Sequence, residues 1–193
     1  MLLTCCDCGK FGVSEILSLI QIIIGIIAIV FAWWIPRKIQ WEQRYNQLLS
    51  EYRGHDFGTA VTDIGRFFYY TCNKDVSRIE DEYAKRYNDE IENKELDNSK
   101  KLHYQRRLLA QFYWDLDVCA HSIYIGKRRV QKDFTSREAN LLKIIYYMNN
   151  ASQSPQVFYD LSCPDLLPPP AKSINKQIKD IYKILKNAKP YVR

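Results

Sequence analysis

A run of twenty uncharged, mostly aliphatic residues near the start of the chain constrains its fold more than any other feature. The run covers residues 16–35 and contains nothing more polar than Ser18 and Gln21. As a helix, a segment of this length extends about 30 Å, which is the thickness of the hydrocarbon core of a bilayer. Its aliphatic and aromatic side chains together favour membrane insertion by roughly 4 to 8 kcal/mol. We therefore expect residues 16–35 to form a transmembrane helix.

The end of the run disfavours two alternatives, a cleaved signal peptide and a buried core helix. A signal peptide has a shorter apolar region that ends in small residues, and a core helix of a soluble protein is rarely apolar on every side. Here the run ends in Trp33 and Trp34, which suit an interfacial aromatic belt, and Arg37 and Lys38 follow at once. These four residues mark the predicted transmembrane boundary.

The distribution of basic residues predicts the orientation of the span. Only Lys10 precedes the run, whereas Arg37, Lys38 and Arg44 follow it closely. Because cytoplasmic segments carry the excess of Lys and Arg, we expect residues 1–15 outside and the rest in the cytoplasm. No second apolar run approaches eighteen residues. The sequence thus predicts a single-pass protein of the inner (plasma) membrane.

Cysteines cluster in the predicted extracytoplasmic tail, residues 1–15. The spacing of Cys5 and Cys8 occurs in redox motifs and in half of many zinc sites, but no second Cys or His pair lies nearby in the sequence. Acylation of Cys5, Cys6 or Cys8 beside a membrane helix and cross-linking of two chains are further alternatives. The simplest interpretation is an unstructured tail, and the role of the three thiols stays open.

The residues after the run predict an all-α body. Gly and Pro are rare, at seven each, which favours helices over a many-turned sheet. Apolar side chains recur at helical spacing in five segments, which we expect to form a cytosolic bundle of about five helices over residues 36–150. The segments are residues 38–53, 57–71, 75–97, 99–125 and 136–150.

Single residues are expected to mark the ends of these helices. Pro36 should kink or interrupt the helix at the membrane boundary. Gly54 and Gly126 should end the first and the fourth helix of the bundle. Thr135 and Glu138 match a capping box at the start of the fifth.

Four basic residues fall in the connection that follows the fourth predicted helix. They are Lys127, Arg128, Arg129 and Lys132. A plain solvated turn and a contact for anionic lipid or phosphate are both compatible with this cluster.

The C-terminal segment has the most regular amphipathic pattern in the body. After a Pro-rich connection over residues 151–170, residues 171–193 carry an apolar stripe and an opposed row of lysines. The stripe is Ile174, Ile178, Ile181 and Leu185, and the lysines are Lys172, Lys176, Lys179, Lys183 and Lys186. The segment accounts for the whole formal net charge of +6. Either the stripe docks on the bundle, or the helix lies on the anionic inner leaflet with its lysines facing lipid.

Motifs that carry chemistry are scarce. Asp117 and His121 stand four residues apart, so a helix places them on one face, where Asp117 would orient His121 for proton transfer. No nucleophile accompanies them, and an ordinary polar pair is the alternative. The sequence has no phosphate-binding Gly-rich loop, no HExxH and no G-x-S-x-G, and its three histidines are dispersed. We therefore expect no metal and no cofactor and, because the basic excess is confined to the tail, no specific nucleic-acid binding.

A series of aromatic, aliphatic and basic residues in the body also supports a resemblance. The series is Trp41, Tyr45, Leu48, Leu49, Tyr52, Arg53 and Phe57, followed by Gln105, Arg106, Arg107, Phe112 and Phe134. In this layout, over residues 16–150, the chain resembles uncharacterised families of short bacterial single-pass membrane proteins with a cytosolic helical domain. The resemblance implies one N-terminal span and a cytosolic bundle, with no activity, cofactor or catalytic residue attached.

Taken together, the sequence predicts a membrane-anchored helical interaction, adaptor or sensor protein that contacts membrane lipid and a protein partner. The first alternative is a membrane effector that self-associates through its span, where Ala28 and Ala32 have the spacing of small residues at helix contacts. The second alternative is a hydrolytic enzyme that uses Asp117 and His121. A non-enzymatic role is favoured, because no familiar catalytic motif is present.

Overall fold

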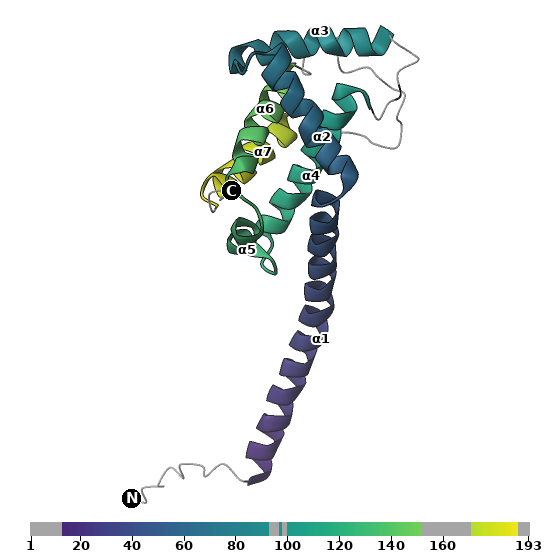
Figure 1. Ribbon diagram of the computed structural model, residues 1–193. Coiled ribbons are helices and arrows are strands. Elements are labelled where there is room, and N and C mark those ends of the chain that lie inside the picture. The colour runs from purple at the N-terminus through teal and green to yellow at the C-terminus, as the bar shows by residue number, and fades with distance from the viewer. Residues whose placement is uncertain (1–12, 93–96, 98–99, 152–170, 189–193) are drawn as a thin grey trace, which may run out of the picture. The chain divides into compact units, whose positions relative to one another are not determined.

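The computed structural model describes residues 13–92, 97, 100–151 and 171–188, and in this part of the chain every regular element is a helix (Figure 1). The predicted all-α fold is thus confirmed. The thiols of Cys5, Cys6 and Cys8 lie outside the described residues, as does nearly all of the predicted Pro-rich connection. The chain divides into two compact units, Met1–Gln40 and Trp41–Arg193. The second unit is called the body below.

Helix α1 (Val13–Tyr52) belongs to both units. Within residues 16–35 it is long and apolar enough to cross a membrane, and none of these residues is buried. Of the two predicted effects of Pro36, an interruption is wrong, because α1 continues through this residue, and a kink stays a prediction. A proline removes one backbone donor, which a helix of forty residues tolerates. Residues 41–52 of α1 are part of the body, where Tyr45 and Leu48 are buried.

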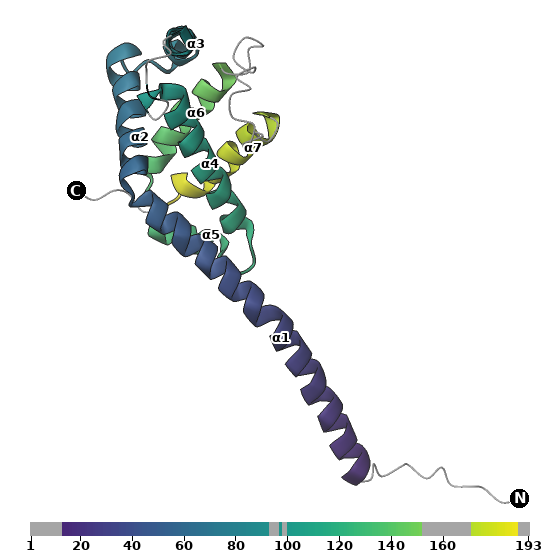
Figure 2. The same cartoon turned by 90° about the vertical axis from the view of Figure 1, so that its right-hand side faces the viewer.

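Helix α4 is the central helix of the body. Figures 1 and 2 show α4 (Leu102–His121) between α2 on one side and the pair of α6 and α7 on the other. The helices that pack against α4 include α2 (His55–Arg66), α3 (Ile79–Glu92), α5 (Gly126–Asp133), α6 (Arg137–Ala151) and α7 (Ala171–Lys186). Two short elements link α2 to α3, the π-helix η1 (Phe67–Thr71) and the 3-10 helix η2 (Val76–Arg78).

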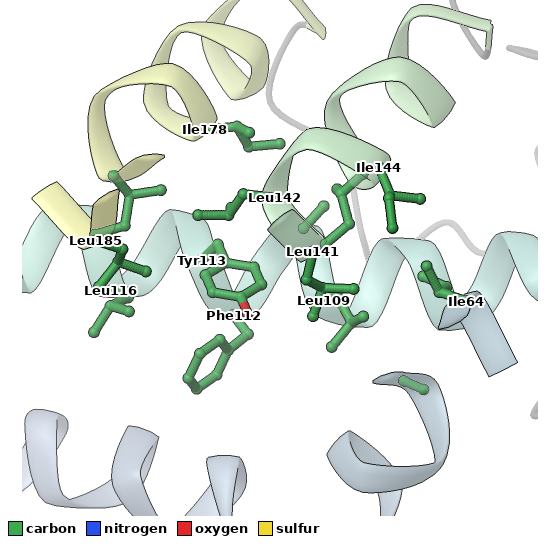
Figure 3. Packing of buried hydrophobic residues seen from close by; sticks show 14 of the residues in the cluster. Ile64, Leu109, Phe112, Tyr113, Leu116, Leu141, Leu142, Ile144, Ile178 and Leu185 are labelled. Carbon is green, nitrogen blue, oxygen red and sulfur yellow. The ribbon is translucent and has the colours of Figure 1, made fainter. Parts of the chain in front are cut away.

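The apolar stripes predicted from helical spacing form the core of the body. Leu109 and Leu116 of α4, Leu142 of α6, and Ile178 and Leu185 of α7 belong to one buried cluster (Figure 3). Burial of such side chains contributes about 1.5 to 3 kcal/mol each and is the main force that holds the helices together. The predicted helical segments over residues 75–97 and 136–150 correspond to α3 and α6.

The fourth predicted helix is shorter than expected. α4 ends at His121 because Ser122 leaves the helical conformation: its hydroxyl donates to the carbonyl oxygen of Cys119 at 2.9 Å and accepts from the backbone N–H of Ile125 at 3.1 Å. Ile123, which lies within the predicted helical segment 99–125, is instead 84% exposed in the turn that follows.

The predicted basic loop is also wrong, since its residues form helix α5. Gly126 begins this helix instead of ending the previous one. Its φ of +76° lies in the left-handed region, where a glycine is free of the strain that a Cβ would introduce. Lys127, Arg128 and Lys132 are therefore presented from a helix surface, and Arg129 turns toward α1.

Glu138 is not used as the capping box predicts. Its side chain is buried, and its two carboxylate oxygens accept hydrogen bonds from the hydroxyl groups of Tyr113 at 2.5 Å and Tyr52 at 3.0 Å. The pattern of residues 135–138 marks the start of α6 correctly. The Glu138 side chain, however, does not cap this helix but links α6 to α1 and α4 within the core.

Candidate functional site

The last turn of α4 brings the predicted pair Asp117 and His121 together. Nδ1 of His121 lies 3.2 Å from Oδ1 of Asp117 and 3.0 Å from the backbone carbonyl oxygen of Asp117. The Asp117 side chain is buried, whereas 45% of the His121 side chain is exposed. The pair thus has one covered and one accessible member.

His121 lines a hollow of about 420 Å³ at the junction of α4, α5 and α7. Most of the lining side chains are polar. The other lining residues are Lys127, Gln131, Asp180, Lys183, Ile184 and Asn187. Nε2 of Gln131 donates to the carbonyl oxygen of Ile184 at 3.0 Å, which holds α5 against α7 and fixes one wall of the hollow.

Electrostatics at this site favour the neutral form of one carboxyl group. Burial raises the pKa of Asp117 above its ordinary value, the charge of His121 opposes this shift, and the neighbouring carboxylate of Asp180 adds to it. A carboxyl group with a raised pKa beside an imidazole is suited to proton transfer. None of the seven lining residues carries a hydroxyl or thiol for attack on a substrate. The hollow therefore offers proton transfer without a Ser, Thr or Cys nucleophile.

Sequence reasoning found the pair on α4 but not the residues that complete the hollow. Asp180, Lys183 and Asn187 reach it because α7 packs on α4 and α5. The only signal for this contact was the apolar stripe of α7. That stripe predicts that the helix docks, but it does not say which helix of the bundle receives it.

Helix α7 docks on the body, which is the first of its two predicted arrangements. Ile178, Ile181 and Leu185 are buried against α4 and α6. Four of the five predicted lipid-facing lysines are described and exposed. They are Lys176, Lys179, Lys183 and Lys186, whereas the side chains of Lys172 and Ile174 lie outside the described residues.

Two of the exposed lysines on α7 have partners within the body. Nζ of Lys179 lies 5.0 Å from the ring centre of Tyr146, and its hydrogen bond lowers the pKa of that tyrosine. Nζ of Lys183 lies 3.1 Å from Oδ1 of Asp180. Part of the basic face of α7 is thus engaged with the protein itself.

The four predicted boundary residues of α1 interact in pairs one helical turn apart. The guanidinium of Arg37 lies 3.8 Å from the ring centre of Trp33, and Nζ of Lys38 lies 5.0 Å from that of Trp34. All four side chains are exposed. Cation–π contacts of this kind keep the basic groups and the indole rings at one level along the helix.

A pair of exposed tyrosines was not predicted as a functional feature. Tyr69 and Tyr70 lie on η1, are 54% and 76% exposed, and have ring centres 5.5 Å apart. Three and four residues after Tyr70, Asn73 and Lys74 have φ values of +53° and +63°, and Nζ of Lys74 lies 4.1 Å from the ring centre of Tyr69. We call residues 67–74 the tyrosine turn. The sequence signal was the four consecutive aromatics at 67–70, which cannot all face the core.

The remaining histidines do not assemble a metal site. His103 is largely covered and its Nδ1 lies 3.5 Å from Oε2 of Glu90, and Nε2 of His55 lies 3.5 Å from Oγ1 of Thr59 on the same helix. Within the described part of the chain, no three His, Cys, Asp or Glu side chains gather closely enough to hold a metal ion.

The chain matches no protein family, no curated protein and no solved structure. The layout shared with short bacterial membrane proteins therefore remains an interpretation of the sequence, and the functional argument depends on the geometry above.

Proposed function

We propose that this chain is a single-pass membrane protein whose helical body serves as a binding, adaptor or sensor module. The supporting observation is the change in exposure along α1. Every residue from 16 to 35 is exposed, whereas Tyr45 and Leu48 of the same helix are buried in the body. An uncovered apolar surface of this length requires an apolar environment, and a lipid bilayer matches its length.

The proposed orientation places the body in the cytoplasm, at the inner (plasma) membrane. The support is the excess of Arg37, Lys38 and Arg44 over Lys10 across the span. The stacking of Arg37 on Trp33 and of Lys38 near Trp34 fits an interface where indole rings and basic groups occupy the same level.

The tyrosine turn is the part of the body best suited to bind a protein partner. Exposed tyrosines are enriched at protein interfaces, because they bury a large area and lose little conformational entropy. Tyr69 and Tyr70 are held on a π-helix and followed by two left-handed residues, Asn73 and Lys74. Non-glycine residues in that region cost energy, and such strain concentrates at functional segments.

The test is affinity capture of the full-length protein from gently solubilised membranes, with quantitative mass spectrometry. The variant Tyr69→Ala/Tyr70→Ala is compared with Tyr104→Ala, which removes another exposed tyrosine from the body. We expect a discrete set of partners that is kept by Tyr104→Ala and reduced at least tenfold by the double variant. Recovery of the same proteins with all three chains would contradict a binding role of the tyrosine turn.

Self-association through the span is the alternative, and one observation favours it. Ala28 and Ala32 lie one turn apart on an uncovered helix, and open space surrounds Gly25 on the same helix. Small residues at this spacing let two helices approach closely. Under this alternative, Ala28→Leu/Ala32→Leu abolishes cross-linked oligomers of the full-length protein in membranes.

A hydrolytic role for Asp117 and His121 is less well supported. The pair is adjacent to a hollow, but the lining residues of that hollow provide no hydroxyl or thiol nucleophile. A water molecule would have to serve instead, with His121 as the base.

A further inference from the structure

The turn between α4 and α5 exposes one apolar side chain almost completely. Ile123 is 84% exposed, the largest exposed fraction among the large apolar side chains of the described residues. One exposed isoleucine is ordinary on a protein surface. The basic residues that follow Ile123 distinguish it from an isolated exposed side chain.

Three exposed basic residues on α5 follow Ile123 in the sequence. They are Lys127, Arg128 and Lys132. Lys127 lines the hollow beside α4, where its charge acts to lower the pKa of Asp117. At 100° per residue the three basic residues fall within an arc of about 140° on the surface of α5. On α7, two of the four described lysines, Lys179 and Lys183, are engaged by Tyr146 and Asp180.

Two contacts join α5 to the residues of α1 that belong to the body. Nη1 of Arg129 lies 2.5 Å from Oε1 of Glu42, and the hydroxyl of Tyr45 donates to Oδ2 of Asp133 at 2.9 Å. In the sequence, Glu42 follows Ile35, the last residue of the apolar run, by seven residues.

We propose that Ile123, Lys127, Arg128 and Lys132, called the α5 corner, bind the anionic headgroup surface of the membrane that α1 spans. The three basic side chains contact lipid phosphates, and Ile123 enters the interfacial layer. The proposal rests on the membrane anchoring proposed above and adds the lipid class that the body recognises.

A lipid surface fits the α5 corner better than a free phosphate does. The basic groups are spread over an arc instead of converging on one point, which suits several headgroups in a plane. An exposed isoleucine contributes nothing to binding a small anion, whereas the interface of a bilayer accepts an apolar side chain. The two sources of phosphate are separated in the experiment below.

The test is lysine labelling of the full-length protein in lipid nanodiscs, read by peptide mass spectrometry. One set of discs contains phosphatidylcholine alone, and the other contains roughly 30% of the anionic lipid phosphatidylglycerol. An amine-reactive acetylating reagent reports the accessibility of Lys127 and Lys132, and Lys85 on α3 is the internal control. We expect labelling of Lys127 and Lys132 to fall at least threefold in the anionic discs, with no change at Lys85 and with full recovery in 1 M salt.

A matched variant provides the second measurement. In Lys127→Gln/Arg128→Gln/Lys132→Gln, the amide hydrogen exchange of the turn that contains Ile123 should be equally fast in both kinds of disc. The wild-type turn should exchange more slowly in anionic discs. Thermal unfolding of the variant, compared with the wild type, shows that the body remains folded.

Three outcomes would overturn the proposal. Equal labelling of Lys127 and Lys132 in both kinds of disc would show that the α5 corner does not bind anionic lipid. Protection in phosphatidylcholine discs by added inorganic phosphate would assign the site to a small anion. Failure of the chain to enter discs at all, measured by flotation, would overturn the membrane anchor and this proposal together. A chain that enters the discs without protection of Lys127 and Lys132 would overturn only the proposal for the α5 corner.

Discussion

The hydroxyl of Tyr45 on α1 donates a hydrogen bond to Oδ2 of Asp133 on α5 over 2.9 Å, across 88 positions of sequence. Arg129 strengthens the same junction, because its guanidinium lies 5.0 Å from the ring centre of Tyr45 and pairs with Glu42. The helix that carries the apolar run is thus also a structural part of the body.

Two substitutions of Tyr45 distinguish the contribution of its hydrogen bond to stability from the contribution of its buried ring. Tyr45→Phe loses one hydrogen bond and should lower the free energy of unfolding of the body by about 1 kcal/mol. Tyr45→Ala also removes a fully buried ring and should cost about 3 to 5 kcal/mol. Urea unfolding of the detergent-solubilised protein measures both. Equal losses for the two variants would contradict the burial of the ring.

The core acid Glu138 makes a second prediction. Glu138→Ala removes the acceptor of the hydroxyl groups of Tyr52 and Tyr113 and leaves the fully buried Tyr113 unsatisfied. We expect a loss of about 1 to 3 kcal/mol, because an unpaired buried donor keeps its desolvation cost. Asn140→Ala, at an exposed position on the same helix, is the control and should change stability by less than about 0.5 kcal/mol. Equal effects of the two substitutions would exclude the buried cluster.

Glu90 should make stability depend on acidic pH. Burial would raise its pKa, but hydrogen bonds from His103, from the backbone N–H of Leu102 and from Arg86 outweigh that effect and lower the pKa below its ordinary value of about 4.5. A carboxyl group with a lowered pKa in the folded state contributes stability above its unfolded pKa and loses it as the pH falls through the folded value.

The measurement for Glu90 is a comparison with Glu90→Gln across pH. At pH 7 the variant should be less stable by about 1 to 3 kcal/mol, because it lacks the charged acceptor at the start of α4. The difference should shrink steadily below about pH 4.5. A difference that stays constant from pH 7 to pH 3 would show that the ionised carboxylate has no special role.

Asp117 should make stability depend on pH in the opposite direction to Glu90. Because burial raises its pKa, the folded state holds the proton more tightly than the unfolded state does, and this contribution to stability is lost as the pH rises through the folded pKa. Asp117→Asn imitates the protonated form and should therefore be more stable than the wild type at pH 7 and equal to it at pH 3. A variant that is less stable at pH 7 would indicate that the ion pair with His121 outweighs the burial of Asp117.

Helix periodicity predicted most of the fold, and local exceptions account for the errors. The stripes of α3, α4, α6 and α7 recur at helical spacing, so their buried faces followed from the sequence alone. Ile123 fits the same stripe, yet Ser122 ends α4 one residue before it. Gly126 carries the same glycine signal whether it ends one helix or begins the next, and only the observed end of α4 at His121 and start of α5 at Gly126 distinguish the two.

The candidate sites were predictable only in part, because they depend on contacts between distant segments. The pairing of Asp117 with His121 follows from a spacing of four residues. Helix α7 packs about sixty positions away in sequence, and an apolar stripe does not name its partner, so Asp180 and Lys183 were not placed beside them. Glu138 matched a local capping pattern. Nothing in the neighbouring sequence indicated that its carboxylate accepts hydrogen bonds from tyrosines on two other helices.

The most direct test of the central claim, that α1 anchors the chain in a membrane, is alkaline carbonate extraction of membranes that contain the full-length protein. Ile23→Asp/Ile27→Asp should cost about 5 to 7 kcal/mol of insertion free energy, which is comparable to the whole gain expected for the run. Ile23→Leu/Ile27→Leu is the matched control. We expect the wild type and the Leu variant to stay in the membrane pellet and the Asp variant to be released. Release of the wild type into the carbonate supernatant would contradict the account.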